Sequence, residues 1–237
     1  MSADVPNDGK ALTVTVDGTA FARIPIRTRV VLRGDDLDTF IAEYAAPVVR
    51  DGDVLFVTEK IVAITQGRSF TLDEIQPRAL ARFLSKYVTR TSYGIGLGMP
   101  ETMEMALREC GTPRILFAAV VSAVTKLFGR RGDFYRIAGD KARAIDGPTS
   151  GTIPPYNKAV VLGPDRPAEV SARLRTLLAE KSGVTVDVAV VDINDIGGNI
   201  LGSTLDKPGE QRLVRILRDN PLGQGHQSTP LGVIRAA

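Results

Sequence analysis

The chain is poor in the residues that support thiol and imidazole chemistry. Its 237 residues include one histidine, one cysteine and no tryptophan. A single cysteine cannot form a disulfide within the chain, and a single histidine cannot complete a zinc site of several imidazoles. A Cys–His pair within one chain would have to join Cys110 and His226. We therefore expect chemistry carried by carboxylates, amides, Lys, Arg and backbone groups, in a reducing compartment such as the cytoplasm.

Long apolar runs and strong net charge are also missing. The longest apolar stretch runs from Ile115 to Phe128 and is shorter than the roughly 20 residues that a membrane-spanning helix needs. The first ten residues, MSADVPNDGK, carry acidic side chains where a secretory signal has an apolar core. The net charge is +3, which is too weak to indicate nucleic-acid binding. We expect a cytoplasmic protein that binds neither a membrane nor nucleic acid.

Glycine and proline are abundant, and they predict a fold with many short elements. The chain contains 23 Gly and 14 Pro, and apolar residues make up 43% of it, so it can form a core without disulfides. Residues 1–10 are predicted to be a flexible tail. Residues 11–237 are predicted to form one domain, with two closely packed halves, 11–130 and 131–237, as the alternative.

Hydrophobic periodicity predicts strands and helices in mixed order, which favours an α+β or mixed-sheet α/β fold. Alternation around Asp17-Gly18 indicates a hairpin, and the residues after Asp36 have the spacing of a capped helix. The apolar run over residues 54–65 predicts one long or bent strand. We expect further helices over residues 77–90, 100–110, 115–129, 167–183 and 209–221, further strands at the start of 134–155 and over 158–164, 184–193 and 230–235, and a Gly-rich turn over 194–203.

Asp192 is the first candidate metal ligand. It ends an apolar strand and leads into Asn194 and Asp195, and open α/β sheets bind ligands at the carboxyl ends of their strands. Hard cations such as Mg²⁺ or Mn²⁺ take oxygen ligands from such positions. Alternatively, Asp192 or Asp195 caps the following turn or helix, which is a common role for Asp and Asn.

A second segment with carboxylates, residues 138–147, also follows a predicted strand. Its Asp140 could share one cation with Asp192, because two such loops can meet at one edge of a sheet. Alternatively, Lys141 and Arg143 neutralise the acidic side chains on a solvated loop.

Several cationic or glycine-rich segments are weaker candidates. Lys60 could bind a phosphate or carboxylate, although an edge-strand lysine that prevents aggregation is the simpler interpretation. Arg68 follows a turn that could contact an anion, and His226 could lie beside a substrate. Residues 94–98 lack the glycine spacing of a nucleotide loop. Residues 129–133 are typical of a solvated basic turn.

Taken in order, these segments resemble the coenzyme F420-0:L-glutamate ligase (F420-0:gamma-glutamyl ligase) family. The similarity covers most of the chain from about Ile24. The matching residues are Pro25-Ile26 with Thr28, Gly34-Asp35-Asp36-Leu37, Asp51-Gly52-Asp53-Val54-Leu55, Lys60-Ile61-Val62, Gly67-Arg68, Ala138-Gly139-Asp140, Asp192 with Asn194, and Gly223-Gln224-Gly225 before Pro230.

The resemblance implies a ligase fold with mixed sheets and flanking helices, and an enzyme that joins L-glutamate to a small acidic acceptor. GTP or ATP would phosphorylate a carboxylate, and the glutamate amine would then displace phosphate from the acyl phosphate. The resemblance also implies a divalent metal, Mg²⁺ or Mn²⁺, and an intertwined homodimer. It leaves the catalytic residues unassigned. It implies Asp140 and Asp192 as metal ligands, and Lys60, Arg68, Asn194 and Gln224 as contacts of the nucleotide or substrate.

The chain departs from the family pattern in two segments. Ala63-Ile64-Thr65-Gln66 stands where the family has a serine-lysine-alanine-glutamate run. Asp195-Ile196-Gly197-Gly198-Asn199 stands where the family has an arginine-bearing segment, and the part that follows is short. The alternative function is therefore a protein of the same fold that binds nucleotide, metal or a deazaflavin-like ligand without ligase activity.

Overall fold

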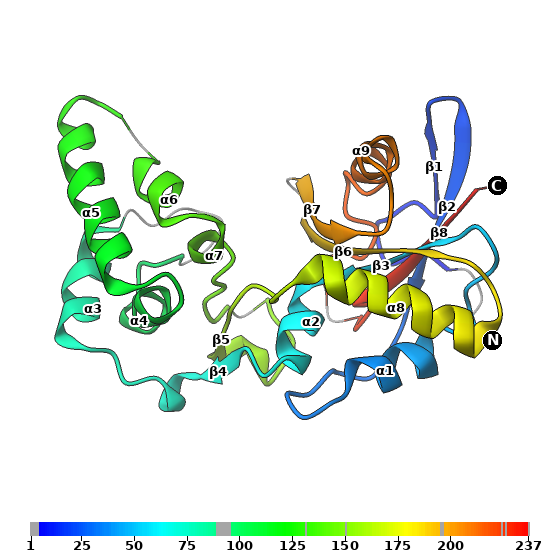
Figure 1. The fold of residues 1–237 in the computed structure, drawn as a ribbon, viewed down its shortest axis with the longest axis horizontal. Coiled ribbons are helices and arrows are strands. Elements are labelled where there is room, and N and C mark those ends of the chain that lie inside the picture. The colour runs from blue at the N-terminus through cyan, green and yellow to red at the C-terminus, as the bar shows by residue number, and fades with distance from the viewer. Residues whose placement is uncertain are drawn as a thin grey trace. The chain divides into compact units, whose positions relative to one another are not determined.

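The protein folds into two compact units, as seen in a computed structural model that describes residues 5–88, 96–130, 132–149, 151–194, 197–223, 225 and 227–236 (Figure 1). Unit 1 consists of Met1–Gly67 and Pro164–Ala237. Unit 2 consists of Arg68–Gly163 and is inserted between the two segments of unit 1. The alternative prediction was two consecutive halves that meet between residues 130 and 131. That boundary lies inside unit 2, and the two units are related by insertion and not by succession along the chain.

Unit 1 is built on a mixed sheet with the strand order β1-β2-β8-β3-β6-β7. Its strands are β1 (Thr13–Val16), β2 (Thr19–Ile26), β3 (Val54–Thr58), β6 (Asp187–Asn194), β7 (Gly197–Ser203) and β8 (Leu231–Ala236). β3 and β6 are parallel, with Thr58 level with Val191, whereas the other neighbours are antiparallel. β1 and β2 form the predicted hairpin around Asp17-Gly18.

Helices cover both faces of this sheet. They are α1 (Leu37–Tyr44), α2 (Glu59–Thr65), α8 (Pro167–Ser182) and α9 (Lys207–Ile216). Figure 1 shows α9 on one side of the sheet and α1 and α8 together on the other. The predicted cap of the first helix is confirmed, since the Asp36 side chain accepts a hydrogen bond from the Thr39 amide at 2.8 Å. The fold class is α+β, as the sequence predicted.

Alternation along β6 places Asp192 on the face away from α9. The core on the α9 side contains Ala189 and Val191, and Ile193 packs against it. Because successive strand residues point to opposite faces, Val190 and Asp192 share the other face. Asp192 thus continues the row of β6 side chains on the side of α8.

Residues 54–65 form a strand followed by a helix, so the prediction of one long strand was wrong. β3 ends at Thr58 and α2 begins at Glu59. The four residues Ile61–Ile64 are all buried, and a run that is apolar on every side carries no periodicity to distinguish a helix from a strand. Lys60 therefore lies in the first turn of a helix, at the carboxyl end of β3.

The Gly-rich segment after Asn194 is a strand where we predicted a turn. β7 pairs with β6 from Gly197 to Ser203. Gly202 explains part of the glycine content, because a Cβ atom there would lie 2.3 Å from the Ala168 amide nitrogen at the start of α8. Glycine thus allows the backbones of β7 and α8 to approach closely.

Unit 2 is mostly helical. Its helices are α3 (Ala79–Leu84), α4 (Pro100–Glu109), α5 (Thr112–Leu127), α6 (Asp133–Ala138) and α7 (Asp140–Arg143), with 3₁₀ turns at Leu72–Glu74, Ser85–Tyr87 and Tyr156–Lys158. β4 (Ser69–Thr71) and β5 (Ala159–Val161) pair antiparallel. α6 forms where we expected a short strand, and α3 is shorter than the predicted helix over 77–90. In the described ranges no single helix is long and apolar enough to cross a membrane; α4 and α5 reach that composition only together, across a bend of 118°.

The predicted tail is attached to unit 1 over the residues that the structure describes. Asn7 is buried, and its Nδ2 atom donates to the Leu222 carbonyl oxygen and to Thr229 Oγ1, both at 2.7 Å. Lys10 Nζ donates to the Asp219 carbonyl oxygen at 2.7 Å. The segment before β1 is thus part of the folded unit.

Candidate functional site

One edge of the unit 1 sheet, which we call the carboxyl edge, gathers the ends of three strands that run in the same direction. These strands are β2, β3 and β6. The residues before β8 join them, because the Thr28 amide donates to the Ser228 carbonyl oxygen at 2.9 Å and the Thr58 amide to the Pro230 carbonyl oxygen at 3.0 Å. Ligands of open α/β sheets bind at edges of this kind.

Three of the residues that the resemblance marked lie at the carboxyl edge. Lys60 follows β3, and Asp192 and Asn194 form the end of β6. Lys60 and Asp192 are half-buried, whereas Asn194 is exposed. The parallel register of β3 and β6 brings these positions to the same end of the sheet. The sequence could mark each residue, but their gathering at one edge follows from the strand pairing.

Asn194 also stabilises the turn between β6 and β7. Its Oδ1 atom accepts a hydrogen bond from the Gly197 amide at 3.2 Å. Asn194 thus caps this turn, which is the role that we considered for the neighbouring Asp residues. Asp195 lies outside the described residues, as do Gln224 and His226.

The N-terminus of α8 packs beside the same edge. Gly202, against which the first turn of α8 lies, pairs with Val190, two residues before Asp192. Ser171 Oγ donates to the Gly202 carbonyl oxygen at 3.0 Å and fixes this contact. The amide groups at a helix N-terminus carry partial positive charge and favour anions. Lys60, Asp192 and this helix end thus belong to the same end of the sheet.

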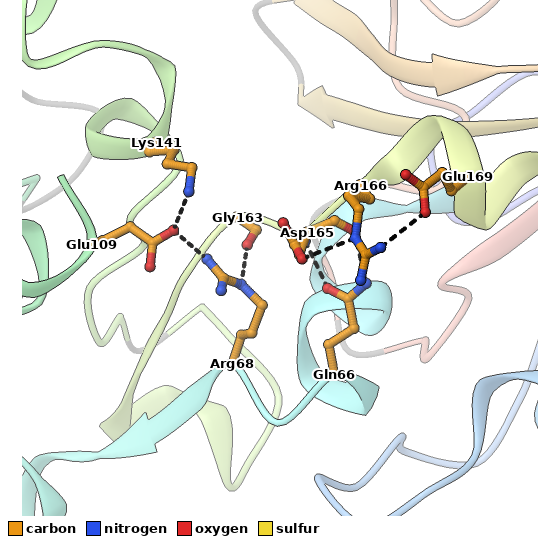
Figure 2. Close-up of polar contacts among 8 residues, drawn as sticks. All are labelled: Gln66, Arg68, Glu109, Lys141, Gly163, Asp165, Arg166 and Glu169. Carbon is orange, nitrogen blue, oxygen red and sulfur yellow. Dashed lines mark hydrogen bonds and ion pairs between the residues drawn. The ribbon is translucent and has the colours of Figure 1, made fainter.

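Gln66 holds the segment that leads into α8 (Figure 2). Its side-chain amide exchanges two hydrogen bonds with the backbone of Asp165. Arg166, the next residue, forms exposed ion pairs with Asp165 and Glu169 at 3.4 and 3.2 Å. Gln66 is one of the residues that depart from the family pattern, and here it has a structural role.

Arg68, the second predicted cationic contact, belongs to unit 2 and is engaged there. Its Nε atom donates to the Gly163 carbonyl oxygen at 2.6 Å and its Nη2 atom to Glu109 Oε1 at 2.7 Å (Figure 2). Lys141 Nζ lies 3.2 Å from the same carboxylate oxygen. Burial would raise the pKa of Glu109, but the hydrogen bonds from Arg68 and Lys141 hold this pKa below its usual range. Nothing in the sequence marked Glu109 as their common partner.

Asp140 is the first residue of α7 in unit 2, and it follows the helix α6 where we expected a strand. Its side chain is 96% exposed and lies 3.2 Å from Arg143 Nη1. Arg143 thus pairs with Asp140 as the alternative had it, but on a short helix and not on a loop, and Lys141 pairs with Glu109. Asp140 and Asp192 thus belong to different units of the chain.

Carboxylates are sparse around both candidate ligands. Within the part of the chain that the structure describes, no group of three or more Asp, Glu, His or Cys side chains is arranged to hold a metal ion. Mg²⁺ commonly binds through one or two carboxylates and completes its octahedron with substrate phosphates and water. A cation at the carboxyl edge would be of this substrate-assisted kind.

The acidic motifs that carry the resemblance stabilise unit 1. Asp35 Oδ1 accepts from Arg29 Nη2 at 3.0 Å and Asp35 Oδ2 from the Leu32 amide at 2.7 Å, and the hydrogen bond from Arg29 lowers the pKa of the Asp35 carboxyl. Asp53 is buried and bound by Arg235, with Nε–Oδ1 and Nη2–Oδ2 distances of 2.9 and 2.6 Å. These motifs thus hold the loop before α1 and the start of β3 in place.

Comparisons with known proteins agree with the resemblance. The model of the family described as F420-0:Gamma-glutamyl ligase matches residues 25–201. The coenzyme F420:L-glutamate ligase of Methanopyrus kandleri is 29% identical over 164 residues, which cover 69% of this chain and 56% of that protein. The aligned part therefore spans little more than half the length of that relative.

Proposed function

Because the chain belongs to the F420-0:gamma-glutamyl ligase family, we propose that it is an amide ligase that joins L-glutamate, or a similar amine, to a small acidic acceptor. The relative from Methanopyrus kandleri is named for L-glutamate and coenzyme F420, so a deazaflavin related to F420 is our proposed acceptor. The carboxyl edge supports the proposal, because it combines an acidic side chain, Asp192, with the positive charge of Lys60 and the start of α8.

In the proposed reaction, GTP or ATP activates the acceptor. A carboxylate oxygen of the acceptor attacks the terminal phosphorus, the nucleoside diphosphate leaves, and an acyl phosphate results. The glutamate nitrogen then attacks the acyl carbon, inorganic phosphate leaves, and the amine loses a proton as the amide forms. Lys60 and the positive end of the α8 dipole would stabilise the negative charge of the phosphates.

Mg²⁺ or Mn²⁺ fits the oxygen donors at the end of β6. The Asp192 carboxylate and the Asn194 amide oxygen would hold the ion, which when bound neutralises charge on the phosphoryl oxygens. Asp140 as a further ligand, and Arg68 and Gln224 as substrate contacts, remain proposals that rest on the resemblance. The same holds for the homodimer.

A second function is favoured by the segment before Arg68. Where the family has lysine and glutamate, this chain has Ile64, which is buried in α2, and Gln66, which binds the backbone of Asp165. Two ionic groups of the expected site are thus replaced by groups that stabilise the fold. A protein that binds nucleotide, metal or a deazaflavin without ligase activity is therefore the alternative.

Glutamate-dependent release of phosphate distinguishes the two functions. The purified protein is incubated with Mn²⁺, GTP or ATP, F420-0 as acceptor, and L-glutamate, and the acceptor is analysed by mass spectrometry. The ligase proposal predicts phosphate release in proportion to an acceptor that has gained one or more glutamate residues. Nucleotide binding without glutamate-dependent release would support the alternative. If the protein binds neither a nucleotide nor a divalent cation, both proposed functions are contradicted.

The role of Asp192 has its own test. We predict that Asp192→Asn weakens Mn²⁺ binding, measured by titration calorimetry in the presence of nucleotide, by at least about tenfold. Asp17→Asn is the control, because Asp17 lies in the β1–β2 turn at the other end of the sheet. Both variants should unfold at the same urea concentration as the wild type. An unchanged Mn²⁺ affinity in folded Asp192→Asn would remove Asp192 from the site.

A further inference from the structure

Glu109 in unit 2 binds two cations through a single oxygen atom (Figure 2). Its Oε1 atom lies 2.7 Å from Arg68 Nη2 and 3.2 Å from Lys141 Nζ. Glu109 is the last residue of α4, Arg68 precedes β4, and Lys141 lies in α7. Three segments that are distant in the sequence thus bring one carboxylate and two cations together.

Two contacts fix the orientation of the Arg68 guanidinium group. Its Nε atom donates to the Gly163 carbonyl oxygen at 2.6 Å, and its Nη2 atom donates to Glu109 at 2.7 Å. These bonds use two of the five N–H groups of a guanidinium. Nη1 makes no hydrogen bond to the residues that the structure describes. Nη1 and the second N–H of Nη2 form one edge of the planar group, and such an edge can bind two oxygens of a carboxylate or phosphate.

The charges of this group do not balance. One carboxylate faces two cations, so an excess of positive charge remains. The side chains of Arg68 and Glu109 are 22% and 14% exposed, and solvent screens such partly buried charges less than it screens exposed ones. Lys141 is 68% exposed, and an exposed ion pair adds little to stability. A ligand therefore explains the second cation better than the stability of the fold does.

The position of Glu109 also indicates a role other than stability. The last carbonyl groups of a helix carry partial negative charge, so a carboxylate in the last turn is unfavourable there. Positive charge extends beyond Arg68 and Lys141. Burial and the charge of Glu109 raise the pKa of the adjacent Cys110 thiol, and the charges of Arg114 and Lys141 act in the opposite direction. Cations thus gather around this end of α4.

We propose that Glu109 is a positioning residue, which holds Arg68 and Lys141 side by side so that they bind an oxyanion of a substrate. The oxyanion is a phosphate or carboxylate group that contacts the Nη1 edge of Arg68 and the ammonium group of Lys141. The inference deepens the proposed function, because the choice of ligands rests on it. GTP carries phosphates, L-glutamate carries carboxylates, and the acceptor is acidic, so the experiment must distinguish these three sources.

The test measures binding without turnover. GTP, F420-0 and L-glutamate are each titrated alone into the full chain by calorimetry. We expect Glu109→Gln to raise the dissociation constant of one of them at least about tenfold. Loss of the negative charge alone would strengthen the binding of an anion, so weaker binding reports lost positioning. Glu101→Gln removes the same charge at the other end of α4 and should change the dissociation constant by less than about twofold.

A double-mutant cycle determines whether Glu109 acts through Arg68. In an Arg68→Met background the group that Glu109 positions is gone. Glu109→Gln should then change the dissociation constant of the same ligand by less than about twofold. Circular dichroism checks that each variant is folded. If Glu109→Gln is not, the exposed Lys141→Met is the second variant, and it should raise the dissociation constant of that ligand about fivefold.

Three outcomes would overturn the proposal. These are a wild type that binds none of the three ligands, a folded Glu109→Gln variant that binds them as tightly as the wild type or more tightly, and an equal loss of affinity with and without Arg68. Ligase activity is measured separately. If the wild type binds a ligand through Arg68 but adds no glutamate, the proposed function fails and this site stands. If the wild type adds glutamate and the variants bind every ligand normally, only this site is rejected.

Discussion

Gln66 and Asp165 are joined by two hydrogen bonds although 99 residues separate them in the sequence. The Gln66 Nε2 atom donates to the Asp165 carbonyl oxygen at 2.8 Å, and the Asp165 amide donates to Gln66 Oε1 at 2.7 Å. The side-chain amide thus pairs with the backbone as a neighbouring strand would. It ties the end of α2 to the residue before Arg166, which precedes α8 with a φ of 44°.

Gln66→Glu should lose half of this pairing. A carboxylate can accept from the Asp165 amide, but it cannot donate to the Asp165 carbonyl oxygen and repels it. We expect the free energy of unfolding, measured in urea at neutral pH, to fall by about 1 kcal/mol. Gln211→Glu, at an exposed position of α9 in the same unit, makes the same change of charge and should lower the free energy of unfolding by less. Equal effects of the two substitutions would show that the pairing contributes nothing.

Gly202→Ala should destabilise unit 1 because the new methyl group would meet backbone atoms. A Cβ atom at Gly202 would lie 2.3 Å from the Ala168 nitrogen and 2.5 Å from the Pro167 carbonyl carbon. Neither can move without shifting α8 away from β7. We expect a loss of about 3 kcal/mol in the free energy of unfolding. Gly34→Ala, with no atom within 4 Å of the added Cβ, is the control and should be nearly neutral. Similar stability of the two variants would disprove the close contact.

Glu104 should make unit 2 sensitive to acid. It is 1% exposed and accepts from the Arg78 amide at 3.1 Å, from Arg78 Nε at 3.0 Å and from Arg108 Nε at 2.9 Å. Burial would raise the pKa of Glu104, but these hydrogen bonds outweigh it and lower the pKa below its ordinary value. A lowered folded-state pKa stabilises the protein above the unfolded pKa of about 4.3, and this stabilisation is lost as the pH falls through the folded value.

Glu104→Gln removes that dependence on pH. We expect the variant to be less stable than the wild type by about 2 kcal/mol at pH 7, with the difference shrinking below about pH 4. Urea unfolding at a series of pH values measures both quantities. The exposed Glu180→Gln serves as the control and should show neither effect. If the difference in the free energy of unfolding between the wild type and Glu104→Gln stays constant down to acidic pH, the charge of Glu104 does not stabilise the fold.

Much of the fold could be predicted from local signals. The Asp17-Gly18 hairpin, the helix capped by Asp36 and the helix that ends at Gly183 each have a turn or cap residue that acts within a few positions of the chain. α2 could not be predicted in this way, because burial on all sides hides its period. β7 was missed for another reason, since its Gly202 is required by the approach of α8, which is distant in sequence.

The candidate site could be predicted only as separate residues. Asp192 and Lys60 stand out as polar residues beside apolar runs, and the parallel pairing of β3 with β6 then brings them to one edge. Asp140 carried the same kind of signal, but a helix precedes it and Arg143 pairs with it. Local pattern cannot reveal that Asp140 and Asp192 belong to different units, because unit 2 is defined by contacts between residues that are distant in sequence.

Because unit 2 is inserted into unit 1, the ribosome completes unit 2 before it completes the sheet of unit 1. Every residue of unit 2, from Arg68 to Gly163, leaves the ribosome before β6 and β8, which complete the sheet of unit 1. β3 must therefore wait for the neighbours on both of its sides, Val188 of β6 and Val233 of β8 among them. Contacts between residues so far apart form slowly. Until they form, the apolar β3 segment lacks both of its neighbouring strands, and unpaired apolar strands are prone to aggregate.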